Sequence, residues 1–133
     1  MTDNLSRQKR SWNMSRIRSK NTAPEMVVRK AIFSMGYRFR LHEKKLPGKP
    51  DIVLSKFKVA IFVNGCFWHL HKCKHLPKSR AKYWKLKLEE NVRRDCQNLR
   101  KLRKLCWSVF VVWECWTKKP EYLRTKLEKF LNR

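Results

Sequence analysis

The sequence predicts a single α/β domain in which helices flank a central sheet. Its length of 133 residues and mass of 16.3 kDa suit one domain, with a basic arm at residues 1–20 preceding a folded part at residues 21–133. The composition is 42% hydrophobic and includes six Trp, three Tyr and seven Phe, which is ample for a packed core. Hydrophobic periodicity predicts the order helix, three strands, helix, strand, helix.

The first helix is expected to begin at Thr22. Thr22 and Glu25 have the spacing of a capping box, in which the hydroxyl accepts a hydrogen bond from the backbone N–H three residues later. Pro24 falls in the first turn, where its missing N–H costs little. Gly36 is expected to end this helix, because glycine readily adopts the left-handed conformation found after helix C-termini.

Three strands are predicted next. Residues 37–41, Tyr-Arg-Phe-Arg-Leu, alternate between apolar and charged side chains with period two, which predicts a strand. Residues 46–50, Leu-Pro-Gly-Lys-Pro, predict a turn that places Asp51 at the start of a second strand at residues 52–54. The unbroken apolar run at residues 59–63 is typical of a central strand.

The C-terminal half contains the remaining elements. Residues 64–80 show no regular periodicity, and a long helix is expected from Ala81 to Leu105. Its apolar stripe comprises Trp84, Leu88, Val92, Leu99 and Leu102. Residues 108–113 predict a buried strand, and Pro120 favours the start of a closing helix that extends to Leu131.

Positive charge is the outlying property of the composition. Thirty-four Lys and Arg against ten Asp and Glu give a formal net charge of +24 and a sequence pI of about 10.5. Such an excess favours a polyanionic partner, and nucleic acid is the usual one; the alternative is a solvated basic surface. An anionic membrane would also attract this charge, but no segment has the roughly 20 apolar residues of a spanning helix. The N-terminus also has no apolar signal region, so we expect a cytoplasmic protein.

Five cysteines, Cys66, Cys73, Cys96, Cys106 and Cys115, occur in a chain without an export signal, which argues against a disulfide framework. Cys66, His71 and Cys73 lie within eight residues, and Cys115 follows a predicted strand end. Thiolates and an imidazole in this grouping predict a closed structural zinc site. The alternative is that Cys66 and Cys115 are small buried apolar residues. For Cys96 and Cys106, core packing is the preferred interpretation.

Asp51 and two aromatic residues are further candidates for function. An aspartate at the head of a strand is a suitable ligand for Mg²⁺, which prefers oxygen donors, but it is also an ordinary turn residue. Phe67 and Trp68 stand between the candidate zinc ligands. From the residues alone, core packing is preferred for both, although the surrounding positive charge would also suit stacking on nucleic acid bases.

A series of motifs extends along most of the chain. In order, they are Asn13-Met14, Thr22-Ala-Pro-Glu25, Leu46-Pro-Gly-Lys-Pro-Asp51, Asn64-Gly-Cys-Phe-Trp-His69, His71-Lys-Cys73, Tyr83-Trp84, Asn91-Val-Arg-Arg-Asp95 and Val112-Trp-Glu-Cys115. Together they resemble the very-short-patch (Vsr) mismatch repair endonucleases over roughly residues 11–116. The resemblance implies the restriction-endonuclease-like fold, with a mixed central sheet flanked by helices. It also implies nicking of one strand 5′ to the thymine of a T·G mismatch left by deamination of 5-methylcytosine.

The same resemblance implies roles for individual residues. Asp51 and the backbone carbonyl of Val63 would bind a catalytic Mg²⁺, while Glu25 and His69 would hold metal-bound waters. The structural Zn²⁺ would be bound by Cys66, His71, Cys73 and Cys115. The residues expected to contact DNA are Phe67, Trp68 and Trp84 as wedges in the duplex, and Met14, Arg16 and Lys20 in the arm.

The resemblance also implies partners. Double-stranded DNA carrying a T·G mismatch is the expected substrate, and a monomer suffices to nick one strand. A cytosine-5 DNA methyltransferase and a repair polymerase would be functionally coupled to this activity. The protein would then be associated with the bacterial nucleoid in the cytoplasm.

Asn64 departs from the family pattern, because better-known members carry His at this position. An Asn side chain can orient a water or a phosphate but cannot accept a proton at neutral pH. Three explanations remain open: His69 acts alone, a metal-activated water needs no side-chain base, or activity is reduced. Two alternative functions follow, a catalytically weak or silent zinc-containing DNA-binding module and another nuclease of the same fold.

Overall fold

The computed structural model describes residues 22–69, 71 and 79–132. In chain order, its elements are α2 (Ala23–Ser34), β1 (Arg40–Leu41), β2 (Ile52–Leu54), the 3-10 helix η1 (Ser55–Phe57), β3 (Val59–Asn64), α3 (Ala81–Lys104), β4 (Ser108–Trp113), the 3-10 helix η2 (Glu114–Lys118) and α4 (Pro120–Leu131). The predicted element order is confirmed. The basic arm at residues 1–20, with Met14, Arg16 and Lys20, lies outside the described residues, as does Cys73.

The four strands form one mixed sheet in the order β1-β2-β3-β4. β1 pairs antiparallel with β2 and β2 antiparallel with β3, whereas β3 and β4 run parallel over six pairs from Val59↔Ser108 to Asn64↔Trp113. A parallel pair requires a crossover connection, and α3 provides it. The carboxyl ends of β3 and β4 therefore meet at the same edge of the sheet.

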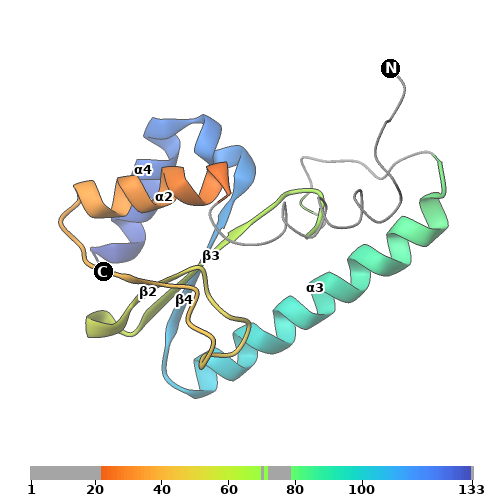
Figure 1. The fold of residues 1–133 in the computed structure, drawn as a ribbon, viewed down its shortest axis with the longest axis horizontal. Helices are drawn as coiled ribbons and strands as arrows, with labels where there is room; N and C mark the ends of the chain where they lie inside the picture. The colour runs from red at the N-terminus through yellow and green to blue at the C-terminus, as the bar shows by residue number, and fades with distance from the viewer. Residues whose placement is uncertain (1–21, 70, 72–78, 133) are drawn as a thin grey trace, which may run out of the picture.

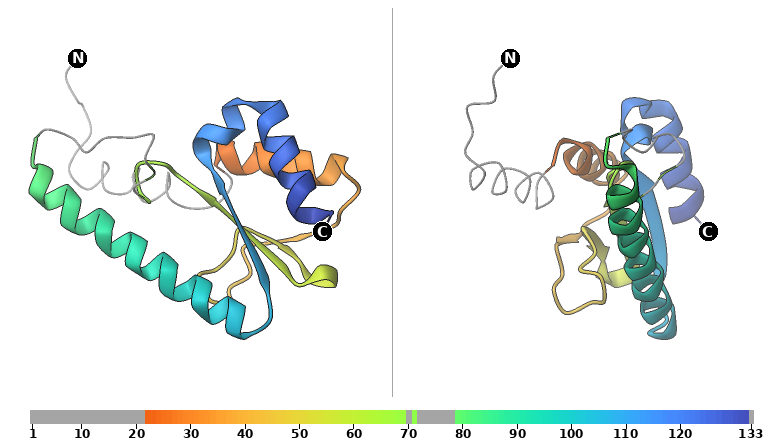
Figure 2. Two further views of the ribbon diagram at one scale, coloured as in Figure 1. Left: turned by 180° about the vertical axis from the view of Figure 1, so that it is seen from behind. Right: turned by 90° about the vertical axis from the view of Figure 1, so that its right-hand side faces the viewer.

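Helices lie on both faces of the sheet, with α2 and α4 on one side and α3 on the other (Figures 1 and 2). The main core lies between the sheet and the α2 and α4 pair. Its buried members are Val28, Ile32, Ile52, Leu54, Val59, Ile61, Val112, Leu123 and Leu127. The side chains of β3 alternate, so that Val59 and Ile61 enter this core while Phe62 faces the groove beside α3.

The start of α2 agrees with the capping interpretation. The Thr22 hydroxyl accepts a hydrogen bond from the Glu25 backbone N–H at 3.4 Å, and Pro24 lies in the first turn. Gly36 follows the helix with φ +94°, the left-handed conformation that glycine tolerates best. This cap places Glu25 on the first turn of α2, at the end of the helix nearest the candidate site.

The prediction of a strand over residues 37–41 is wrong for its first half. Only Arg40 and Leu41 pair, opposite Val53 and Ile52 of β2. β2 is just three residues long, so it offers few partners for a longer β1. Tyr37 and Phe39 instead pack against the main core, which explains their apolar periodicity without strand pairing.

The core interpretation of Cys96 and Cys106 is also wrong, because both are exposed. The first half of α3 extends away from the sheet (Figures 1 and 2). The helix therefore buries only a narrow stripe of its surface. Within it, Leu88, Asn91 and Leu102 are buried, whereas Trp84, Val92 and Leu99 are partly buried. Cys96 lies beside this stripe at the rim of a groove.

Candidate active site and metal centres

A groove of about 820 Å³ lies between α3, the β3–β4 pair and the loop that follows β1. It opens where the parallel strands end, the usual position of ligand sites in open α/β sheets. Its lining includes His42, Asp51, Phe62, Val63, Asn64, His69, Val92, Asp95, Leu99 and Trp113. Five of the sequence-predicted site residues therefore line one cavity: Asp51, Val63, Asn64, His69 and His71.

Asp51 lies immediately before β2, so its side chain is close to the neighbouring strand β3. The backbone N–H of Val63 donates a hydrogen bond of 2.7 Å to Asp51 Oδ2. Burial raises the pKa of the Asp51 carboxyl from 3.8 to about 6, and the nearby Glu25 carboxylate adds to this effect. The Val63 N–H, His42 and His69 lower the pKa in part. A partly buried carboxyl that lines a groove is suited to binding a cation.

Glu25 and His42 lie next to Asp51. His42 Nε2 is 3.0 Å and 2.9 Å from the two carboxylate oxygens of Glu25, and Arg29 contacts Glu25 Oε2 from one turn along α2. Only 3% of the Glu25 side chain and 11% of the His42 side chain are exposed. One ligand atom from each of Glu25, His42 and Asp51 lies within 4.8 Å of the others, which is close enough to hold one metal ion. We call this group the Glu25–His42–Asp51 cluster.

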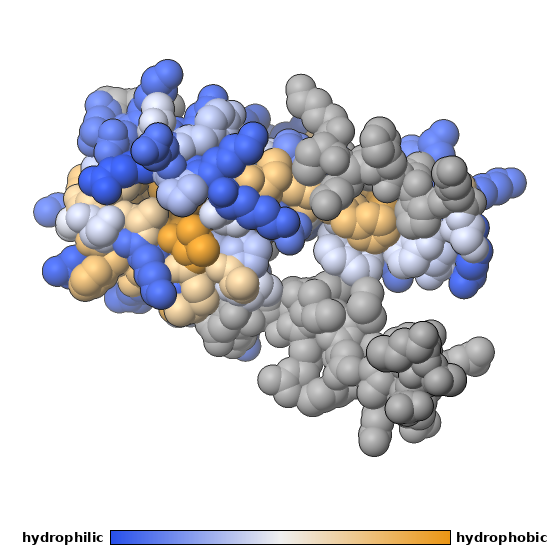
Figure 3. Space-filling view, turned by 90° about the horizontal axis from the view of Figure 1, so that it is seen from above, coloured by the Kyte–Doolittle hydropathy of each residue, from blue (hydrophilic) through white to orange (hydrophobic). Residues whose placement is uncertain are grey.

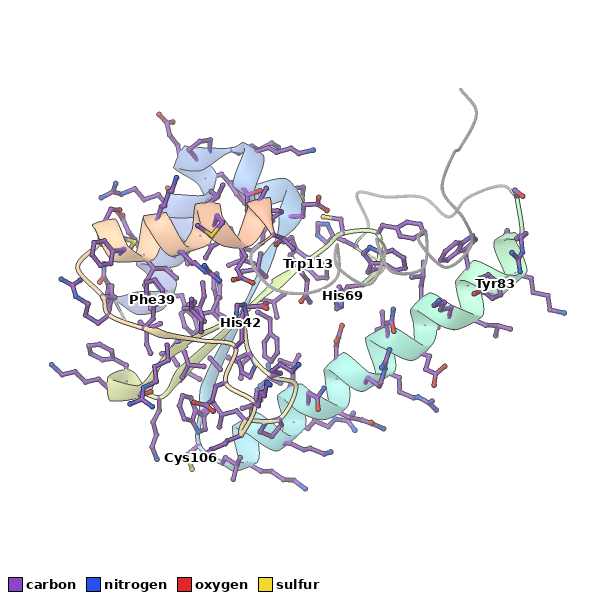
Figure 4. All side chains as sticks on the ribbon, viewed as in Figure 1. Phe39, His42, His69, Tyr83, Cys106 and Trp113 are labelled. Atoms are coloured by element: carbon purple, nitrogen blue, oxygen red, sulfur yellow. The ribbon has the colours of Figure 1, made fainter. Side chains whose placement is uncertain are left out.

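His69 is paired with Asp95 across the groove. Nδ1 of His69 contacts Oδ2 of Asp95, a residue of α3 that is 26 positions further along the chain. A carboxylate on one ring nitrogen fixes the proton at that nitrogen and leaves the other free to exchange a proton. The His69 ring also lies edge-on to Trp113 at a centroid distance of 6.5 Å. Figure 4 labels His42, His69 and Trp113, which all lie around the middle of the molecule.

The second predicted metal centre is assembled in part. Cys66, His71 and Cys115 bring one ligand atom each to within 4.8 Å of one another. Cys115 Sγ is 3.6 Å from His71 Nδ1, and the Cys115 backbone N–H donates to Cys66 Sγ at 3.4 Å. Two sulfurs and an imidazole are a donor set that suits Zn²⁺. We call these three residues the cysteine cluster; the fourth predicted ligand, Cys73, lies outside the described residues.

Two neighbours support the cysteine cluster. The ring of Trp113 stacks on that of His71 at a centroid distance of 4.2 Å and an interplanar angle of 14°. Glu114 Oε1 accepts a hydrogen bond of 3.3 Å from the backbone N–H of Cys66. Because Trp113 contacts His69 as well as His71, it connects the groove with the cysteine cluster.

Phe67, Trp68 and Trp84 form one aromatic cluster beside α3. Their ring centroids are 5.1, 5.4 and 6.0 Å apart with edge-to-face angles, an arrangement that aromatic rings prefer. All three side chains are partly buried rather than enclosed in the core. The backbone carbonyl of Trp68 accepts a hydrogen bond of 3.2 Å from Asn91, which ties the loop to α3.

On one face of the molecule, hydrophilic side chains surround smaller apolar areas. Figure 3 shows this from above, where blue side chains surround orange ones over the described part of the chain. In this basic chain the acidic residues are few, yet Glu25, Asp51 and Asp95 all lie at or beside the groove. Carboxylates gathered at one groove of a strongly basic chain are suited to holding a cation.

Comparison with known proteins places the chain in a family. A family sequence model described as DNA mismatch endonuclease Vsr matches residues 2–75, which is more than half of the chain. This chain belongs to the Vsr family of DNA mismatch endonucleases. Members of the Vsr family hydrolyse DNA internally, so the chain is a metal-dependent DNA endonuclease.

Three relatives support membership of the Vsr family. The chain is 47% identical over 134 residues to the Type II nicking enzyme V.XorIIP of Xanthomonas oryzae pv. oryzae, covering 99% of this chain and 98% of the relative. It is 44% identical over 134 residues to the Type II nicking enzyme V.NmeAIP of Neisseria meningitidis serogroup A, covering 99% and 96%. It is 38% identical over 117 residues to the DNA mismatch endonuclease Vsr of Escherichia coli K12, covering 86% and 75%.

The structure of this Vsr chain adds site residues that the sequence interpretation did not assign. His42 follows a short strand whose partner strand is preceded by Asp51, so antiparallel pairing was the signal that could have joined them. Asp95 lies four residues after Asn91, and helical spacing puts both on one face of α3. Glu114 belongs to the motif Val112-Trp-Glu-Cys115, but its role could not be assigned from the sequence because its contact with Cys66 spans 48 positions.

The Vsr chain has no helix, in the described residues, that is both long enough and apolar enough to span a membrane.

Proposed function

We propose that this chain nicks one strand of duplex DNA 5′ to the thymine of a T·G mismatch by metal-assisted hydrolysis. The observation that carries the proposal is the convergence of Asp51, its neighbour Glu25 and the His69–Asp95 pair on one groove. A relative from Escherichia coli is named a DNA mismatch endonuclease, and two others are named nicking enzymes. The net charge of +24 supports a nucleic acid substrate.

Asp51 is the proposed principal ligand of a catalytic Mg²⁺. The Val63 backbone carbonyl is the proposed second ligand. The Val63 N–H is directed at Asp51. Because the N–H and C=O of a strand residue face the same side, the carbonyl also faces the side on which Asp51 lies. A divalent cation bound there supplies neutralisation of phosphate charge and an activated water. Glu25 lies beside Asp51 and orients the groups around the cation.

His69 is the proposed acid–base residue. Asp95 holds the imidazole by Nδ1, which leaves Nε2 to take a proton from the attacking water or to give one to the leaving oxygen. Asn64 ends β3 at the same cavity and would orient a water or a phosphate oxygen through its amide. This division of labour accounts for an active site with Asn at position 64.

Zn²⁺ is proposed to be structural. Cys66, His71 and Cys115 would hold it together with Cys73, and such a closed four-ligand shell has no open position for substrate. The site would tie the loop after β3 to η2, since Cys115 belongs to η2. Chemistry would therefore be confined to the groove.

Recognition of the mismatch is assigned to the aromatic cluster. The side chains of Phe67, Trp68 and Trp84 would insert into the duplex. This insertion costs a few kcal/mol for each base step that is unstacked. A wobble pair is already distorted, so insertion there costs less than in paired DNA. Met14, Arg16 and Lys20 of the arm are proposed to contact the same DNA.

The proposed setting follows from the reaction. Nicking one strand requires one active site, so a monomer is sufficient. A cytosine-5 DNA methyltransferase would create the methylcytosine that deaminates to thymine, and a repair polymerase would refill the patch. Both partners act on chromosomal DNA, so the proposed location is the cytoplasm, with the nucleoid.

A strand-specific nicking assay tests the function. Duplexes of one sequence that differ only in T·G versus C·G would be incubated with the protein and a divalent cation. We expect nicking of the T·G duplex alone, on the thymine strand. Asp51→Ala should bind DNA and lose cleavage by orders of magnitude, because the groove would no longer hold the cation. Equal cleavage by the variant would show that the active site lies elsewhere.

Asn64 favours one second candidate, a zinc-containing DNA-binding module with weak or no turnover. It keeps the cysteine and aromatic clusters but has an amide in place of an imidazole at position 64, the end of β3. In the same assay this candidate predicts preferential binding of the T·G duplex with no nick. Restoring cleavage by Asn64→His would favour it further.

A further inference from the structure

His42 stands out among the groove residues because neither the family motifs nor the proposed mechanism uses it. It follows β1, it lines the groove, and its side chain is only 11% exposed. Its imidazole lies against Glu25, whose side chain is 3% exposed, and Glu25 and Asp51 complete the cluster. An imidazole nitrogen within 4.8 Å of carboxylate oxygens from two residues is a donor set found in mixed nitrogen–oxygen metal sites.

The backbone holds His42 in this position. Its φ is +49°, in the left-handed region that residues with a Cβ seldom adopt, so the chain reverses where β1 ends. Its backbone N–H donates a hydrogen bond of 3.1 Å to the Asp51 carbonyl. The backbone of His42 is therefore tied to the segment that carries Asp51, and the imidazole is held against Glu25.

The distances in the cluster fit a coordination shell. Neighbouring ligands of an octahedral ion with bonds of about 2.1 Å are about 3.0 Å apart. His42 Nε2 lies 3.0 Å from Oε1 and 2.9 Å from Oε2 of Glu25, and an Asp51 oxygen lies within 4.8 Å of its partners in the cluster. Arg29 contacts Oε2 of Glu25, and His42 Nε2 lies close to both carboxylate oxygens, so the imidazole is the groove-lining partner of this carboxylate.

We propose that His42 is a direct ligand of the active-site cation, so that the site is a mixed nitrogen–oxygen centre that prefers Mn²⁺ to Mg²⁺. The inference rests on the proposed function, because it takes Asp51 as the residue that holds the cation. Mg²⁺ prefers oxygen donors and gains little from an imidazole, whereas first-row transition ions bind imidazole nitrogen more strongly. A role for His42 as a mere hydrogen-bond partner of Glu25 is the competing outcome of the test.

The test uses Mn²⁺ as a paramagnetic probe on the full chain. Mn²⁺ affinity is measured from the loss of the free-ion signal in electron paramagnetic resonance, and Mg²⁺ affinity from its competition with Mn²⁺. Pulsed measurements then record any nitrogen coupling to bound Mn²⁺. The proteins compared are the parent, His42→Gln, Asp51→Asn, and His69→Gln as the matched control that removes a different imidazole from the groove.

We expect nitrogen coupling in the parent and in His69→Gln, and none in His42→Gln. A loss of about 10–100-fold in the Mn²⁺ affinity of His42→Gln would also follow from an outer-shell role, so the deciding result is a fall in the ratio of Mn²⁺ to Mg²⁺ affinity, because Gln offers oxygen in place of nitrogen. Asp51→Asn should lose the bound-Mn²⁺ signal. Coupling that persists in His42→Gln or in Asp51→Asn would overturn the proposal, as would an unchanged affinity ratio.

A second measurement avoids dependence on the variant. Parent protein containing ¹⁵N-labelled histidine should replace the ¹⁴N coupling of bound Mn²⁺ with ¹⁵N coupling, and no histidine coupling in this sample would also overturn the proposal. Nicking of the T·G duplex is assayed separately. Nitrogen coupling that depends on Asp51 and His42, in a protein that does not nick, would support this metal site while refuting the proposed function.

Discussion

Replacing Asp51 with Asn should stabilise the cation-free protein at neutral pH while it removes cleavage. The pKa of Asp51 is raised from 3.8 to about 6, chiefly by burial. The folded state therefore binds the proton more tightly than the unfolded state. Its free energy of unfolding falls as the pH rises from 3.8 to about 6 and stays lower above that range. A shift of about two pH units corresponds to about 3 kcal/mol.

Asn keeps the shape of the side chain and an oxygen that can accept the Val63 N–H bond, but it cannot ionise. At about pH 7.5, Asp51→Asn should thus be more stable than the parent by up to about 3 kcal/mol. At about pH 4 most of this difference should vanish, because the parent carboxyl is then protonated. Adding Mg²⁺ at neutral pH should narrow the difference, since binding to the folded parent stabilises it.

The assay is urea unfolding followed by circular dichroism, at both pH values, in buffer without added divalent cations. Glu90→Gln is the matched control: 62% of the Glu90 side chain is exposed, so its loss should change stability by less than about 0.5 kcal/mol. A variant at position 51 that is equally stable or less stable at neutral pH would refute the argument from burial. A substitution that raises stability while it abolishes activity is expected at a residue whose role is functional rather than structural.

Three other predictions concern the zinc site, the wedge and the arm. Protein purified without chelators should contain one equivalent of Zn²⁺ per chain, and its removal should lower thermal stability; elemental analysis that finds none would contradict the site. Trp68→Ala should weaken binding to T·G duplex by roughly 1–3 kcal/mol, while costing less stability than the usual 3–5 kcal/mol of a core aromatic; fluorescence titration and urea unfolding measure both. Removing residues 1–20 should reduce DNA affinity and the salt dependence of binding together, and an unchanged slope would show that the arm does not contact phosphate.

Local chemistry in the sequence was enough to predict most elements. The cap at Thr22, the six-residue strand Ser108–Trp113 and the helix Pro120–Leu131 are confirmed. Each depends on a signal carried by neighbouring residues: a hydroxyl before a helix, a continuous apolar run, and a proline at a first turn. The strand predicted at residues 37–41 depended on its partner instead, and β2 is too short to pair with all of it.

The candidate site divides in the same way. Its motifs placed Asp51, Asn64, His69 and Cys66 in the sequence, because their residue types and order are specific to the family. Their partners come from distant segments, such as Asp95 on α3 for His69. Asp95 is part of a motif, but nothing in the sequence indicates that its carboxylate oxygen meets the His69 nitrogen, because the two residues are 26 positions apart.

The sequence by itself therefore determined the class of fold, the basic charge, the family and most residues of the two candidate metal-binding groups. Only the tertiary structure decided which side chains share a cavity. Burial of Glu25 against His42, and the raised pKa of Asp51, arise from α2, β1 and β2 meeting in space. Desolvation and ligand geometry depend on every segment that surrounds a group, whereas motifs describe only its neighbours along the chain.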